Sequence, residues 1–153
     1  MLYIYAMDQH PHSPQTVIRR ALLLALAVSF ALGALTHAGI DLPLGVTTID
    51  EPLIMPAAVV ESIIAIAFCV AAYAELSRRP YARIASRLAL RIGIAGVLLG
   101  MFALALGRGT RTELNDVFHV VALLSMLIAW QLGPNGRTHR GCWPGRRLAR
   151  RAT

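Results

Sequence analysis

Residues 53–74 have the sequence LIMPAAVVESIIAIAFCVAAYA, an apolar run that contains one charged side chain, Glu61. A helix of roughly 20 apolar residues crosses a bilayer core of about 30 Å. Leu, Ile, Val and Ala follow one another here without the polar alternation of a half-buried strand. The segment therefore predicts a membrane-spanning helix with one carboxylate inside it.

Three further segments of similar length and composition extend this prediction along the chain. One precedes the quoted segment and two follow it. The backbone of a chain in lipid must satisfy its own hydrogen bonds, and the segments lack the alternating pattern of a barrel. We therefore predict an all-α integral membrane protein, a four-helix bundle with spans at about 21–40, 53–74, 88–106 and 114–132.

The composition of the whole chain supports a membrane protein. Of its 153 residues, 56% are hydrophobic and 15% are charged, and the mean hydropathy is +0.58. A soluble domain has about 25% charged residues. The net charge of +7 comes from fifteen arginines that lie between apolar runs, where basic residues set topology, so no nucleic-acid partner is expected. The two cysteines do not indicate a disulfide framework.

The arginines are distributed unevenly, and this predicts the topology. Thirteen precede the first span, lie between the second span and the start of the third, or follow the fourth, whereas two lie in the other loops. Because cytoplasmic loops are enriched in basic residues, both termini are predicted to be cytoplasmic. The predicted organisation is a cytoplasmic N-terminal segment at 1–18, a four-helix membrane domain at 19–133 and a basic cytoplasmic tail at 134–153.

The arginine-only, alanine-rich composition is typical of a GC-rich bacterial genome, which favours a multi-pass protein of the bacterial cytoplasmic (inner) membrane. Two alternatives stay open at the N-terminus. Arg19, Arg20, the following apolar stretch and Thr36-His37-Ala38 as a small-x-small site also fit a cleaved signal peptide. Met7 is an alternative to Met1 as the true start.

Small residues favour close contacts between helices in a membrane. The third span contains Gly96 and Gly100 four residues apart, with Gly93 beside them. The first span has a comparable row, which consists of Ala21, Ala25, Ser29 and Gly33. We expect both rows to face neighbouring helices.

Ionisable side chains inside the spans form the candidate site. At about 1.5 Å per residue, Glu61 and His119 lie roughly 7–9 Å from the starts of their helices, and His37 lies near the outer end of the first span. Asp116 precedes His119 by three residues and shares nearly the same helix face. Since an ionisable group in hydrocarbon is costly, these four residues are the candidate functional cluster, in the outer leaflet.

The cluster has several interpretations. In the structural interpretation, Glu61 joins the second helix to a neighbouring helix, for example through His119. In the metal-binding one, Asp116 and His119 present a carboxylate-x-x-His pair, with Glu61 and His37 as further ligands; two histidines would alternatively hold a haem. In the third, a buried carboxylate beside a histidine takes part in proton or quinone chemistry. Catalytic and cofactor-binding residues are not assigned.

Two local patterns give smaller predictions. Thr110 and Glu113 match a capping box that would open the fourth helix. Glu75 lies beside Arg78 and Arg79, which predicts an ion pair at the membrane interface.

The segment Pro56-Ala57-Ala58-Val59-Val60-Glu61-Ser62-Ile63-Ile64-Ala65-Ile66, together with a first helix followed by a longer outer loop, resembles the DoxX-like group of small bacterial four-helix membrane proteins. The resemblance covers about residues 21–132 and is carried by Glu61 and the layout of the spans. It implies a quinone-linked redox subunit or an accessory membrane protein.

We therefore expect a small accessory or scaffold subunit without catalytic activity of its own, held to itself or to a larger partner by the glycines of the third helix and the polar cluster. The alternative is a redox or metal-binding, quinone-linked membrane protein that uses the cluster. The third hypothesis is a small oligomeric transporter. The expected partners are the lipid bilayer and a second copy of the chain or a larger membrane complex.

Overall fold

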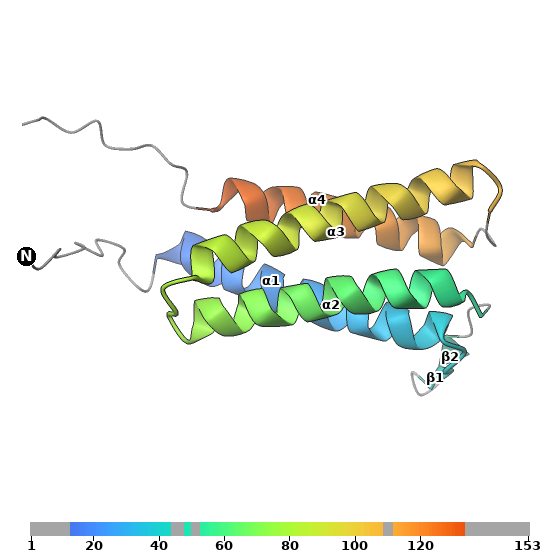
Figure 1. Cartoon of the computed structure of the whole chain (residues 1–153), viewed down its shortest axis with the longest axis horizontal. Coiled ribbons are helices and arrows are strands. Elements are labelled where there is room, and N and C mark those ends of the chain that lie inside the picture. Colours follow the sequence, from blue (N-terminus) through green and yellow to red (C-terminus); the bar gives the residue numbers. More distant parts are fainter. Residues whose placement is uncertain (1–12, 44–47, 50–52, 109–111, 134–153) are drawn as a thin grey trace, which may run out of the picture.

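The computed structural model describes residues 13–43, 48–49, 53–108 and 112–133. These residues form four long helices and a small antiparallel ribbon of two strands (Figure 1). The elements are α1 (Pro14–His37), β1 (Leu42–Pro43), β2 (Thr48–Ile49), α2 (Met55–Leu76), α3 (Ala82–Ala105) and α4 (Glu113–Gln131). Each helix is long and apolar enough to cross a membrane. The predicted all-helical class with four long apolar helices is confirmed, apart from the ribbon, which was not predicted from the sequence.

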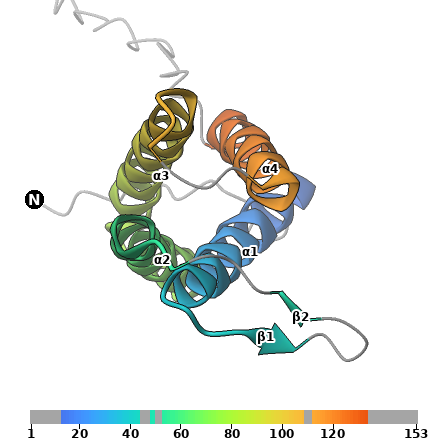
Figure 2. The same ribbon diagram turned by 90° about the vertical axis from the view of Figure 1, so that its right-hand side faces the viewer.

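The helices pack side by side, each antiparallel to the next (Figure 1). Viewed from one end, α1 lies beside α2, α2 beside α3, α3 beside α4, and α4 returns to α1 (Figure 2). We call the end that carries β1 and β2 the ribbon end and the opposite end the basic end. Seven of the eight arginines in the described segments lie in the half of the bundle toward the basic end, namely Arg19, Arg20, Arg78, Arg79, Arg83, Arg87 and Arg91.

The observed helix boundaries differ from the predicted spans at the basic end. α1 begins at Pro14 rather than near residue 21, because the Ser13 hydroxyl caps the helix by accepting a hydrogen bond from the Thr16 amide at 3.3 Å. α3 likewise begins at Ala82 rather than near residue 88. Hydropathy marks only the apolar part of each helix, so the first two turns of α1 and α3, which contain arginines, were placed outside the predicted spans.

The start of α4 also differs from the prediction. Thr112 is the N-cap residue, and its hydroxyl accepts a hydrogen bond from the Asn115 amide at 3.1 Å. Thr110, the predicted capping residue, lies outside the described residues. Two acidic residues, Glu113 and Asp116, lie in the first turn of α4, where a carboxylate interacts favourably with the helix dipole.

Aromatic and aliphatic side chains from all four helices fill the centre of the bundle. Phe30 of α1 stacks on Phe68 of α2 with ring centroids 6.1 Å apart, and Phe118 of α4 meets Phe30 edge to face at 5.3 Å. Gly93 lets α3 approach this cluster, because a Cβ atom there would lie 2.9 Å from Phe68 and 2.6 Å from the sulfur of Met126. The glycines of α3 therefore serve contacts within the chain.

The outer surface of the bundle is strongly apolar. Large side chains on every helix are about half exposed or more, among them Val28, Ile66, Ile84, Leu99, Phe102 and Val121. Monomeric soluble proteins rarely expose such continuous apolar surface. This surface indicates contact with the lipid bilayer.

Replacement of Gly93 by Ala tests the close packing of α3. The added methyl group must displace Phe68 and Met126, and overpacking of this kind costs about 1–3 kcal/mol. We expect a lower midpoint of thermal unfolding in detergent for Gly93→Ala. Ala95→Val adds volume on the exposed side of the same helix and should leave the midpoint unchanged. An equal effect of both substitutions would contradict the packing described for Gly93.

Candidate functional site

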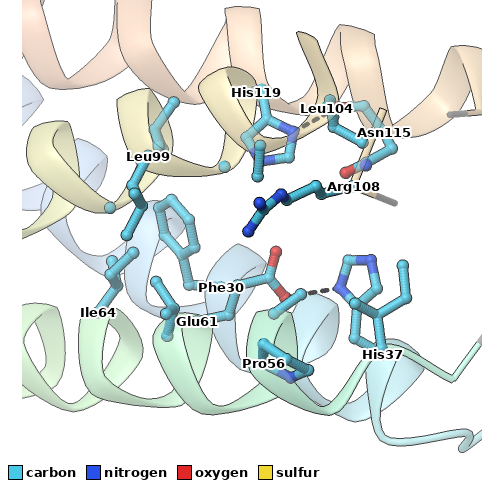
Figure 3. Close-up of a pocket in the computed structure, with 17 residues that line it drawn as sticks. Phe30, His37, Pro56, Glu61, Ile64, Leu99, Leu104, Arg108, Asn115 and His119 are labelled. Atoms are coloured by element: carbon cyan, nitrogen blue, oxygen red, sulfur yellow. Dashed lines mark hydrogen bonds and ion pairs between the residues drawn. The ribbon is translucent and has the colours of Figure 1, made fainter. Parts of the chain in front are cut away.

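A cavity of about 310 Å³, partly open to the surface, lies between the helices near the ribbon end. All four helices and the turn after α3 contribute to its walls, and most of the lining side chains are aliphatic, such as Val60, Ile64 and Leu104 (Figure 3). The polar residues of the lining are His37, Glu61, Arg108, Asn115 and His119. An apolar cavity with a few converging polar groups is the usual form of a small-molecule binding site.

A buried hydrogen bond joins α1 to α2 at the cavity wall. His37 Nδ1 lies 3.0 Å from Glu61 Oε2, and both residues are 5% exposed. Gly33 makes room for the carboxylate, since a Cβ atom at this position would lie 2.7 Å from Glu61 Oε2. An ionised pair and a neutral hydrogen-bonded pair have the same net charge, so a proton can move between the two side chains without charging the cavity.

His119 lies on the α4 side of the cavity, in a defined orientation. Its Nδ1 is 2.7 Å from the Asn115 carbonyl oxygen, which can only accept, so Nδ1 carries the proton. In the neutral ring, Nε2 is then left with a lone pair. A Cβ atom at position 100 would lie 2.9 Å from Nε2, so Gly100 provides the space that this edge of the ring occupies. His119 can accept a hydrogen bond at Nε2 when neutral and donate one when protonated.

Arg108 extends into the cavity from the turn that follows α3. Its guanidinium lies between the Glu61 carboxylate and the His119 ring (Figure 3). Gly107 has a φ of 68°, and the Arg108 amide donates to the Ala103 carbonyl oxygen at 2.9 Å. This glycine-terminated turn ends the helix. The cavity therefore combines one guanidinium with a carboxylate and two imidazoles.

The structure brings three of the four predicted site residues to this cavity. His37, Glu61 and His119 line it, whereas Asp116 is only half-buried and is not part of the lining. The buried polar residues of α4 are Asn115 and His119, four residues apart, and not the predicted pair of Asp116 and His119. Glu61 joins α2 to α1 through His37, and His119 bonds within its own helix.

The metal hypothesis for His37, Glu61, Asp116 and His119 stays a prediction. Within the described ranges, no three His, Cys, Asp or Glu side chains are grouped so that they could hold a metal ion. Of these residues, His37 and Glu61 are in direct contact through their hydrogen bond.

Sequence reasoning missed Arg108, which was treated as part of a short turn. The signal available was its charge, since it is one of only two arginines outside the three predicted cytoplasmic regions. The sequence analysis also misassigned the partners of Glu75. This carboxylate pairs with Arg19 at 2.7 Å and accepts a hydrogen bond from the Ser86 hydroxyl at 2.9 Å, rather than pairing with Arg78 or Arg79.

Comparison of the chain with protein-family models, curated proteins and solved structures finds no significant match. The chain is therefore described by its fold and its pocket: four helices that are each long and apolar enough to cross a membrane, and a buried His–Glu pair at a pocket between them.

Substitution of Glu61 tests the structural part of this site. Glu61→Gln replaces the carboxylate by an amide that can still hydrogen-bond to His37. Glu61→Leu removes every hydrogen-bonding atom from this side chain. Loss of a buried hydrogen-bond partner costs about 1–3 kcal/mol. We expect Glu61→Leu to lower the thermal midpoint in detergent more than Glu61→Gln does.

Glu113→Gln makes the same chemical change at an exposed position in the first turn of α4, and we expect it to lower the midpoint less than Glu61→Leu does. If Glu61→Gln and Glu61→Leu unfold at the same temperature, the hydrogen bond to His37 does not stabilise the bundle.

Proposed function

We propose that this protein is an accessory subunit of a bacterial cytoplasmic membrane that binds a lipid-soluble ligand with a polar, oxygen-containing head of the quinone class. The observation that carries the proposal is the composition of the cavity. Apolar walls contributed by four helices border a space beside Glu61, His37, His119 and Arg108.

The polar groups of the cavity match the chemistry of a quinone head. A quinone carbonyl oxygen accepts hydrogen bonds, and the Arg108 guanidinium supplies donors that stay charged at physiological pH. His119 Nε2 accepts a hydrogen bond from a hydroquinone hydroxyl or, when protonated, donates one to a quinone oxygen. The ring and its apolar chain would contact the aliphatic walls formed by side chains such as Ile64 and Leu104.

The His37–Glu61 pair adds a site for proton exchange. Reduction of a quinone consumes two electrons and two protons. The pair lies at the cavity wall and can release or accept a proton, while the electrons would come from a partner redox protein. Under this proposal the chain holds the ligand and exchanges protons with it, while a partner supplies the electrons. This division fits the role of an accessory subunit better than that of a complete enzyme.

The charge distribution supports an orientation with the cavity in the outer leaflet. The arginines toward the basic end outnumber the single described arginine at the ribbon end, and basic residues are enriched on the cytoplasmic side. The ribbon end would then face outward. The resemblance to DoxX-like proteins fits the same proposal, because Glu61, the residue that carries the resemblance, lies at the cavity.

The glycines of α3 do not supply the outer contact face that an accessory subunit needs. Cβ atoms at Gly93, Gly96 and Gly100 would meet Met126, Ile64 and His119, all within this chain. Association with a partner or with a second copy would therefore use the exposed aliphatic surface. The role as a subunit stays a proposal that co-purification of the native complex can test.

Quinone binding can be measured directly with purified protein in lipid nanodiscs. We expect saturable binding of a short-chain benzoquinone, and we expect Arg108→Gln to weaken it by about tenfold, which corresponds to about 1.4 kcal/mol. Arg91→Gln removes the same charge from the exposed side of α3 and should bind as the wild type does. Non-saturable partitioning, or equal affinity of the wild type and Arg108→Gln, would contradict the proposed site.

A further inference from the structure

At the basic end, a buried ion pair joins three helices. The Arg19 guanidinium of α1 lies 2.7 Å from Glu75 Oε1 of α2, and the Ser86 hydroxyl of α3 donates to the same oxygen at 2.9 Å. Arg19 is 7% exposed. A charge buried to this degree is stable only when it is paired and hydrogen-bonded, so Arg19, Glu75 and Ser86 hold the basic end together.

The charges around this ion pair do not balance. Arg20, Arg83 and Arg87 all act electrostatically on Arg19, whereas Glu75 is the one nearby carboxylate that opposes them in the described part of the chain. Like charges close together at the edge of a low-dielectric region repel one another strongly. An anion beside these arginines would remove the repulsion.

Two guanidinium donors at this place also lack an acceptor. The Nε atoms of Arg19 and Arg20 are buried, and neither has a hydrogen-bond partner among residues 13–43, 48–49, 53–108 and 112–133. A buried donor without a partner costs free energy, so such groups indicate a missing acceptor. Arginine donors are suited to phosphate oxygens, which they contact in pairs.

The surroundings of the arginines favour a lipid over a soluble anion. Val17 and Ile18 precede the arginines of α1 and are each about half exposed. On α3, Ile84 is 72% exposed and Leu88 is 55% exposed, next to Arg83 and Arg87. Exposed aliphatic side chains therefore adjoin the arginines along both helices, which suits a headgroup that carries acyl chains better than a soluble anion.

We propose that Arg19, Arg20, Arg83 and Arg87 form a binding site for the phosphate group of an anionic lipid at the basic end of α1 and α3. Arg19 stays paired with Glu75 through its terminal nitrogen, and its Nε faces the added phosphate charge together with Arg20. The exposed Arg83 and Arg87, one helical turn apart, close the site from the α3 side. The site is separate from the cavity at the ribbon end and does not depend on what the cavity binds.

Native mass spectrometry of the full chain released from detergent tests this proposal with phosphatidylglycerol as the probe. We expect one tightly retained phosphatidylglycerol per chain and little retention of the zwitterionic phosphatidylcholine. An arginine near anionic lipid contributes about fivefold in affinity, so the double variant Arg83→Gln/Arg87→Gln should bind phosphatidylglycerol about 25-fold more weakly. Both residues are exposed, so the variant should fold.

Arg78→Gln is the matched control, because Arg78 is an exposed arginine of the same end, in the turn after α2. It should retain the lipid as the wild type does. Equal losses in Arg78→Gln and in a single Arg87→Gln variant would overturn the proposal in favour of diffuse electrostatic attraction. Inorganic phosphate that displaces phosphatidylglycerol at millimolar concentration would also overturn it, because the site would then bind a soluble anion.

Discussion

The hydrogen bond between His37 and Glu61 is the constraint on which the rest of the ribbon end depends. A carboxylate in an apolar helix needs a partner, and the imidazole at the end of α1 is placed to provide it at 3.0 Å. This contact brings the end of α1 against α2, and Gly33 leaves the space that the carboxylate requires. With those two helices joined, α3 and α4 supply the opposite walls of the cavity, including Gly100 and His119.

Each end of the bundle contains a carboxylate on α2 that needs a partner, and the partners differ between the two ends. At the basic end, Glu75 is held by Arg19 and Ser86 from two other helices, and nearby arginines leave an excess of positive charge. At the ribbon end, Glu61 has an imidazole partner and faces a cavity with mostly aliphatic walls. Glu75 therefore joins helices among several arginines, whereas Glu61 joins helices and borders a space in which a ligand fits.

Much of this arrangement follows from the sequence, because hydrophobic length fixes the number of spans. Helix depth, at a fixed rise per residue, also predicts that His37, Glu61 and His119 lie at one level. The rotation of a helix about its own axis, which decides which side chains face inward, is harder to predict. Asn115 and Asp116 are adjacent on α4, and only packing against the other helices decides that Asn115 is buried while Asp116 is half-buried. The partner of Glu61 depends in the same way on how α1 and α2 meet. Arg108 was missed because the turn at Gly107 directs it inward, and charge alone does not reveal that direction.

The most direct test of the central claim is a map of where a quinone-class ligand contacts the protein. A photoreactive short-chain benzoquinone would be irradiated with the protein in nanodiscs, and the labelled residues identified by mass spectrometry. The account predicts labels on cavity residues such as Val60, Ile64 and Leu104, suppressed by excess unlabelled benzoquinone. Labels confined to exposed residues such as Ile63 and Ile66, unaffected by the competitor, would contradict it.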